Sequence, residues 1–197
     1  MRYSSGITKK PFWFLESKKT ANYILEGFNR EEIFKIAVEK NIYQVETENR
    51  VKTIVHTCFN RLNSLPKIIL KNIINTDLNT SKILVLISIM KTDKLFFEFI
   101  YEIFRNKVIL GEKYLENKDL NIFFEEKKLQ SDIVSSWSEL NIKKLKSSYL
   151  TILFNSGLIN RDNGKNEVVV PIIDYSVEQS LLNNDFSPYL KAINGEN

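Results

Sequence analysis

One regular amphipathic helix, expected over residues 48–65, constrains the fold of this chain more than any other feature of its sequence. Polar and basic side chains, among them Arg50, Lys52, His56 and Arg61, fall largely on one face of this helix. A helix that buries one side and exposes cations on the other suits a nucleic-acid groove, and it suits water equally well. The apolar residues of the opposite face recur at spacings of three, four and seven: Val51, Ile54, Val55, Cys58, Phe59, Leu62 and Leu65.

Two long stretches of the chain lack acidic residues. Residues 49–76 contain no Asp or Glu, although the chain has 24 acidic residues in 197 positions. An even spread would put roughly three in such a window. The absence recurs over residues 140–161, which carry Lys143, Lys144, Lys146 and Arg161. The net charge of +4 is compatible with a polyanionic partner without proving one.

Composition favours helices around a real core. The hydrophobic content of 43% rules out a disordered chain, and six glycines and four prolines are too few for a fold made of strands and turns. Cys58 is the single cysteine, so no internal disulfide is expected, and its thiol should be buried. The longest apolar run, residues 83–90, is too short to span a bilayer, and the start lacks a signal-peptide pattern. The sequence therefore predicts a soluble, cytoplasmic protein.

The first of three expected segments, residues 1–65, has the order of a helix-turn-helix. A helix over 14–26 should end at Gly27, and Asn29 with Glu32 forms a capping box for a helix over 30–40. The connection over 41–47 then leads to the basic helix. Any three-helix bundle can share this order, and the connection is longer than the usual tight turn.

The central segment, residues 66–135, is apolar and aromatic. Helices are expected over 66–75, 80–91, 93–105 and from about 117 to 134, with a connector over 108–115. Residues 95–104 are apolar on nearly every face, which predicts a helix in the centre of the fold. Core packing explains this pattern, and so does a docking surface for another protein. The side chains that would form that surface are Phe96, Phe97, Phe123 and Trp137.

The last segment, residues 136–197, resembles a winged helix-turn-helix followed by a C-terminal helix. Ser138 is a suitable N-cap for a basic helix that Gly157 would end. Asn163-Gly164, placed before a strand expected over 167–171, predicts a short β-hairpin. In a winged fold the helix enters the major groove and the hairpin contacts the DNA backbone.

The residues that enzymes need are largely missing. The chain has a single His and no nucleophile elbow, so the sequence does not support a catalytic triad. One His and one Cys are too few ligands for a structural zinc site. Neither a GxxxxGK[ST] loop nor a GxGxxG motif is present. No enzyme activity, cofactor or metal is therefore expected, although scattered carboxylates leave a metal-dependent nuclease as an alternative.

Several stretches are similar to one known family. They are Tyr3-Ser4-Ser5-Gly6, residues 89–99 (IMKTDKLFFEF), FFEEK at 123–127 with Gln130-Ser131, Ser136-Trp137-Ser138, Lys143-Lys144-Leu145, Gly157-Leu158-Ile159 and Pro171. The chain resembles, nearly end to end, the BrxA family of BREX bacteriophage-exclusion systems. The resemblance implies a helix-rich accessory protein with NusB-like character, acting beside a DNA methyltransferase, an alkaline-phosphatase-like protein and large ATPases. It supplies no catalytic residues.

The sequence thus predicts a mainly α helical bundle that binds double-stranded DNA without catalysis. A scaffold that docks the BREX methyltransferase or ATPase is the alternative, and RNA binding is a third reading that only the NusB likeness supports. No membrane partner is expected. The residues predicted to contact DNA, mostly at phosphates, are Arg50, Lys52, His56, Arg61, Lys143, Lys144, Lys146, Arg161 and Lys165.

Overall fold

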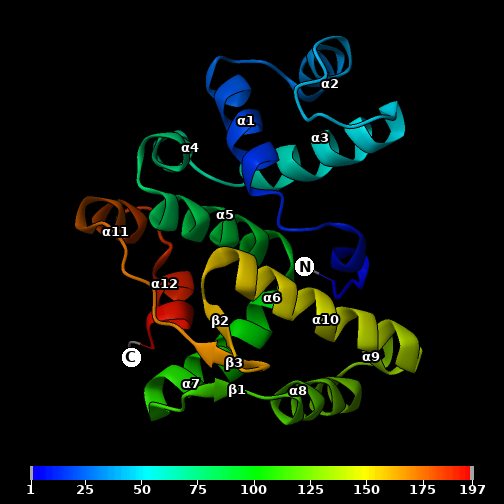
Figure 1. The fold of residues 1–197 in the computed structure, drawn as a ribbon, viewed down its shortest axis with the longest axis vertical. Helices are drawn as coiled ribbons and strands as arrows, with labels where there is room; N and C mark the ends of the chain where they lie inside the picture. Colours follow the sequence, from blue (N-terminus) through cyan, green and yellow to red (C-terminus); the bar gives the residue numbers. More distant parts are fainter. Residues whose placement is uncertain (1, 196–197) are drawn as a thin grey trace.

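Helices joined by short turns make up most of residues 2–195, the part of the chain that the computed structural model describes (Figure 1). The expected mainly helical class is confirmed, and one small antiparallel sheet accompanies the helices. In chain order the elements are η1 (Gly6–Lys9), α1 (Phe14–Leu25), α2 (Arg30–Glu39), α3 (Glu48–Leu62), α4 (Lys67–Asn75), α5 (Leu78–Thr92), α6 (Lys94–Phe99), the π-helical η2 (Ile100–Phe104), α7 (Arg105–Leu110), β1 (Tyr114–Leu115), α8 (Asn117–Gln130), α9 (Asp132–Ser135), α10 (Glu139–Ser156), β2 (Ile159–Asp162), β3 (Lys165–Val168), α11 (Tyr175–Leu182) and α12 (Ser187–Asn194).

Local capping signals mark the starts of α2 and α3. The predicted capping box is present at the start of α2, where the Glu32 amide donates to Asn29 Oδ1 at 3.0 Å and the Asn29 amide donates to Glu32 Oε2 at 2.7 Å. Helix α3 begins at Thr47, whose hydroxyl accepts from the Arg50 amide. Its helical hydrogen bonding stops at Leu62, three residues before the predicted end, and α1 and α2 both pack against it.

The core is built around α5. Residues 83–90 of this helix are all buried, and α5 contacts α1, α3, α4, α6 and α10. A helix that is apolar on every face needs neighbours on every side, which explains this central position (Figure 1). Along the described chain, every helix is too short or too polar to cross a lipid bilayer.

The helix predicted over 93–105 is longer than expected and changes its winding. It continues from Lys94 to Leu110 as α6, η2 and α7, so the predicted connector over 108–115 is wrong for its first three residues. Within the π segment, the Arg105 amide donates to the carbonyl oxygen of Ile100, five residues earlier. Gly111, in a left-handed conformation with φ of 65°, ends α7.

The predicted hairpin is confirmed. Strands β2 and β3 pair antiparallel, and the two residues between them, Asn163 and Gly164, have φ of 49° and 79°, as a type I′ turn requires. The second strand spans Lys165–Val168 and not the predicted 167–171. The short strand β1, which the sequence did not predict, adds to the other edge of β3 and gives the strand order β1-β3-β2.

Candidate nucleic-acid interface

The polar face of α3 is exposed and carries three of the predicted DNA contacts. Arg50, Lys52 and His56 are exposed, whereas the opposite face packs against α1, α2 and α5. The Arg50 guanidinium lies 5.0 Å from the centre of the Trp13 ring, a cation–π contact that leaves its charge unneutralised. Within residues 2–195, neither Lys52 nor His56 is paired with a carboxylate. This face therefore presents positive charge to solvent.

His56 is held by one neighbour on each ring nitrogen. Arg30 Nη1 lies 3.4 Å from His56 Nδ1, and Asn60 Nδ2 lies 3.0 Å from His56 Nε2. Both neighbouring nitrogens can only donate, and a neutral imidazole has one accepting nitrogen, so only one of these two contacts is a hydrogen bond in each tautomer. Arg30 also pairs with Glu31 at 2.9 Å, and its hydrogen bond holds the pKa of the Glu31 carboxyl below its ordinary value.

A cleft of about 630 Å³ opens beside these residues, between α2 and α3. Arg30 and Phe34 of α2 line one side, and Lys52 and His56 of α3 line the other. Lys10, from the N-terminal segment, completes the ring of cations. The cleft thus combines four basic side chains with an aromatic wall.

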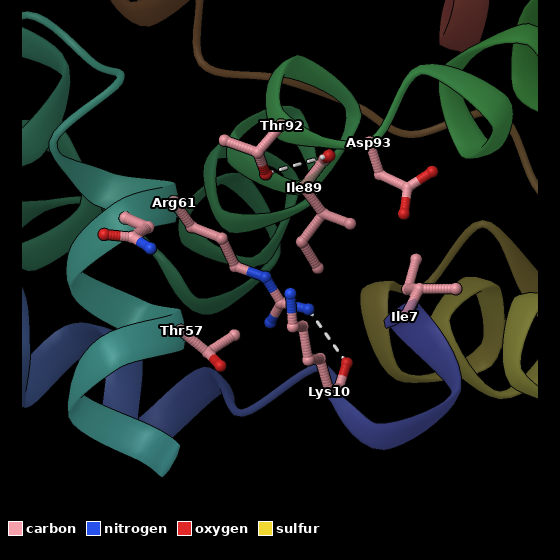
Figure 2. A pocket seen from close by; sticks show the side chains of 8 residues that line it. Ile7, Lys10, Thr57, Arg61, Ile89, Thr92 and Asp93 are labelled. Atoms are coloured by element: carbon pink, nitrogen blue, oxygen red, sulfur yellow. Dashed lines mark hydrogen bonds between the residues drawn. The ribbon is translucent and has the colours of Figure 1, made fainter. Parts of the chain in front are cut away.

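Arg61, predicted to contact DNA from the same helix, is buried, and this prediction requires correction. Its side chain is 4% exposed, and Nη1 and Nη2 donate to the carbonyl oxygens of Pro11 and Lys10, each at 2.8 Å. Burial lowers the pKa of Arg61 to about 10, which leaves the guanidinium charged at neutral pH. Figure 2 shows the side chain reaching from α3 toward Lys10. Arg61 therefore fixes the N-terminal segment and is not available to a phosphate.

A second, smaller cavity of about 150 Å³ also has Lys10 in its lining (Figure 2). Thr57 and Arg61 line it from α3, and Thr92 and Asp93 line it from the end of α5. Burial raises the pKa of the Asp93 carboxyl, although its hydrogen bond from the Phe96 amide and the charge of Arg61 oppose this. The buried Arg61 and the half-buried Asp93 thus place opposite charges in the lining of one cavity.

The second predicted basic helix, α10, begins and ends as the sequence indicated. The Ser138 hydroxyl accepts from the Asn141 amide at 3.3 Å, and Gly157 ends the helix with φ of 86°. Lys143 and Lys144 are exposed, and neither is paired with a carboxylate in the described chain. Lys146 is half-buried and donates to Asn121 Oδ1 at 2.8 Å.

The cations of the hairpin are exposed above aromatic rings. The Arg161 guanidinium lies 4.9 Å from the centre of the Phe154 ring, and Lys165 Nζ lies 4.9 Å from that of Tyr114. These contacts orient both side chains on β2 and β3, and neither cation forms a salt bridge within the described part of the chain.

The N-terminal segment links the two basic helices. Element η1 packs against α10, and the next residues, Lys10 and Pro11, receive the hydrogen bonds of Arg61 from α3. In Figure 1 this segment lies between α3 and α10. Lys10, Arg30 and Phe34 were absent from the predicted site, although the lack of acidic residues over 2–15 is a signal for Lys10. No sequence pattern marks Phe34 as a cleft wall.

The predicted aromatic docking surface is largely core and needs correction. Phe96 and Phe123 are both 0% exposed. Phe96 packs edge-on against Tyr149 at 5.0 Å between ring centres, and Phe123 packs in the same way against Phe99 at 5.3 Å. Phe97 and Trp137 are half-buried. The rings of Phe96 and Phe123 therefore cannot contact a partner.

Comparison with known proteins places the chain in a family. It is 39% identical over 194 residues to the BREX protein BrxA of Bacillus cereus (strain H3081.97), a match that covers 98% of this chain and 97% of the relative. A crystal structure of an uncharacterized protein from Magnetospirillum magneticum shares the fold, with a TM-score of 0.81, 18% sequence identity and full coverage of both chains. The model of the BrxA family matches residues 1–185. The chain therefore belongs to the BrxA family.

Proposed function

We propose that this protein is a non-catalytic accessory component of a BREX phage-defence system that binds duplex DNA, mainly at phosphates. The observation that carries the proposal is the set of exposed cations on two helices with acid-free stretches, where Arg50, Lys52, Lys143 and Lys144 form no salt bridge with any carboxylate of residues 2–195. Phosphate contacts supply most of the affinity of such an interface and little of its sequence preference. The name of the Bacillus cereus relative supports the BREX assignment.

The contacts that we propose come from α3, α10 and the hairpin. Arg50, Lys52 and His56 would act on α3, as in a helix-turn-helix-like unit over residues 1–65. Helix α10 and the hairpin would act as the winged-helix-like part of residues 136–197, joined by a central segment over 66–135 whose NusB-like character is part of the same proposal. The contacts there are Lys143, Lys144, Lys146, Arg161 and Lys165.

Charge reversal on α10 tests the proposal. We expect Lys143→Glu combined with Lys144→Glu to weaken duplex binding by about 100-fold or more at 50 mM salt, because two phosphate contacts become repulsive. Fluorescence anisotropy with a labelled duplex measures this effect, and structured RNA of equal length serves as competitor.

Lys118→Glu is the control. This exposed lysine lies outside the proposed contacts and already pairs with Glu116, so its reversal should leave the affinity nearly unchanged. Equal affinity of the α10 double variant and the unaltered protein excludes α10 from the interface. Preferential release by RNA supports the RNA alternative.

A protein-docking role remains the second candidate, on a different surface from the one predicted. Three large apolar side chains on α8 and α10 are exposed: Ile122 at 53%, Leu129 at 90% and Leu140 at 62%. A BREX methyltransferase, phosphatase-like protein or ATPase is the partner class that this role implies. Such a complex would survive salt concentrations that release DNA, which separates the two functions.

A further inference from the structure

The cleft between α2 and α3 has features that duplex binding does not require. Phosphates on the outside of a duplex need only exposed cations at suitable spacing. This cleft is instead a hollow of about 630 Å³, within the range of small-molecule pockets and much larger than a phosphate group needs. A cleft of that size can hold a ligand that has a large uncharged group in addition to its charged group.

The lining of the cleft divides into a cationic part and an apolar part. Lys10, Lys52 and Arg30 supply positive charge. Within residues 2–195, Arg30 pairs with Glu31, and the charge of Lys10 acts on the Asp93 carboxyl and lowers its pKa against the effect of burial. The ring of Phe34 and the side chain of Val55 supply the apolar part. A flat aromatic group can stack on the ring while a phosphate attached to it reaches the cations.

His56 lines the cleft as well. Its Nδ1 lies 3.4 Å from Arg30 Nη1 and its Nε2 lies 3.0 Å from Asn60 Nδ2, so the ring contacts side chains of both α2 and α3. The hydroxyl of Thr53 and the carboxylate of Glu31 also line the cleft and can bond to a sugar or to an amino group.

We infer that this cleft is a binding site for a single nucleotide, with its phosphate between Lys10, Arg30 and Lys52 and its base against Phe34. The nucleotide comes either from solution or from the unpaired end of a DNA strand. Both sources present the same chemistry to the cleft. The inference rests on the cleft alone and does not require that α10 or the hairpin bind duplex DNA.

The single histidine of the chain provides a direct probe. The imidazole Hε1 signal of His56 can be followed by NMR at constant pH during titration with dAMP, deoxyadenosine or inorganic phosphate. We expect dAMP to shift the signal saturably with a Kd below about 1 mM. Deoxyadenosine lacks the phosphate and inorganic phosphate lacks the base, so each should bind at least tenfold more weakly.

Lys52→Glu tests the cationic part of the cleft. Because Lys52 is exposed, the substitution should leave the fold intact. We expect it to weaken dAMP binding at least tenfold, whereas Lys118→Glu, at an exposed lysine outside the cleft that pairs with Glu116, should leave dAMP binding unchanged. The inference is overturned if dAMP at 10-fold above that Kd limit leaves the His56 signal in place. It is also overturned if deoxyadenosine or phosphate alone matches dAMP, or if Lys52→Glu binds dAMP normally.

Two DNA duplexes identify the source of the nucleotide. One has blunt hydroxyl ends, and the other has a single-nucleotide 5′-phosphorylated overhang at each end. Displacement of dAMP by the overhang duplex alone assigns the cleft to DNA strand ends, and displacement by neither assigns it to free nucleotides. Because free dAMP binding is measured without duplex, a failure of the duplex proposal leaves this test intact, and the reverse also holds.

Discussion

At the scale of single residues, the hydroxyl of Tyr149 is a buried polar group without a hydrogen-bond partner in the described chain. Tyr149 is fully buried against Phe96, Phe99 and Phe124, and its oxygen has no hydrogen-bond partner among residues 2–195. A buried hydroxyl without a partner costs about 1–3 kcal/mol. We therefore expect Tyr149→Phe to raise the free energy of unfolding by about 1 kcal/mol, measured by urea denaturation.

Tyr43 offers the matched control for that prediction. It is also buried, but its hydroxyl lies 2.7 Å from Thr20 Oγ1 and shares a hydrogen bond with it. Tyr43→Phe leaves Thr20 without this partner and should lower the free energy of unfolding by about 1 kcal/mol. Two changes of equal size with opposite sign isolate the hydrogen bond as the cause. A loss of stability in Tyr149→Phe contradicts the prediction.

At the scale of elements, Lys127 ties α8 to the helix that contains the π segment. Its side chain is 4% exposed, and Nζ lies 2.7 Å from both Glu98 Oε2 of α6 and Glu102 Oε1 of η2. Removal of the ammonium leaves the side chains of Glu98, 18% exposed, and Glu102, 39% exposed, without their shared cation. Because solvent partly screens Glu102, we expect Lys127→Met to lower the free energy of unfolding by about 2 kcal/mol at pH 7, less than a fully buried pair would cost.

The loss in Lys127→Met should shrink as the pH falls. Burial raises the pKa of the Glu98 carboxyl, but hydrogen bonds from Lys127 and Tyr3 outweigh this and lower it overall. In the unaltered protein Glu98 therefore stabilises the fold above its unfolded pKa of about 4.3, and this contribution disappears as pH falls through the folded value. In Lys127→Met the pKa of Glu98 in the folded state rises, so protonation of Glu98 at lower pH removes its repulsion with Glu102. Urea denaturation at pH 7 and pH 4 measures the difference.

Lys128→Met is the control for this prediction, since its partners Glu125 and Glu139 are exposed. The free energy of unfolding of Lys128→Met should fall by no more than about 1 kcal/mol. If the two variants lose equal stability, Lys127 is not the connection between α8 and η2.

The elements that could be predicted from sequence are those whose signals are local. Ser138 and Gly157 bound α10 through contacts within four residues, and Asn163-Gly164 specifies the hairpin turn by itself. The burial of Arg61 depends on carbonyl groups about fifty residues earlier in the chain. Helical spacing gives no sign of such a partner. The pairing of β1 with β3 is equally remote in sequence and was missed for the same reason.

At the scale of the whole molecule, the N-terminal segment holds the two basic helices in a fixed relation. Element η1 packs on α10, and Arg61 of α3 binds the carbonyl oxygens directly after it. Packing and hydrogen bonds of this kind keep the two helices close together, so one duplex can contact both if their cations face the same side. The salt dependence of binding can test this arrangement, because each phosphate contact contributes roughly 0.9 to the slope of log K against log salt.

Lys52→Gln on α3 and Lys144→Gln on α10 remove one exposed charge each. If both helices contact the same duplex, each variant should reduce the slope by roughly 0.9, and the double variant by roughly 1.8. Anisotropy titrations from 50 to 200 mM salt measure these slopes, with Lys118→Gln as a control because its ammonium already pairs with Glu116. If the double variant has the same slope of log K against log salt as Lys144→Gln alone, only α10 contacts the duplex. In that case Lys52 acts in nucleotide binding in the cleft and not in duplex binding. Lys52→Glu should then weaken dAMP binding and leave duplex binding unchanged.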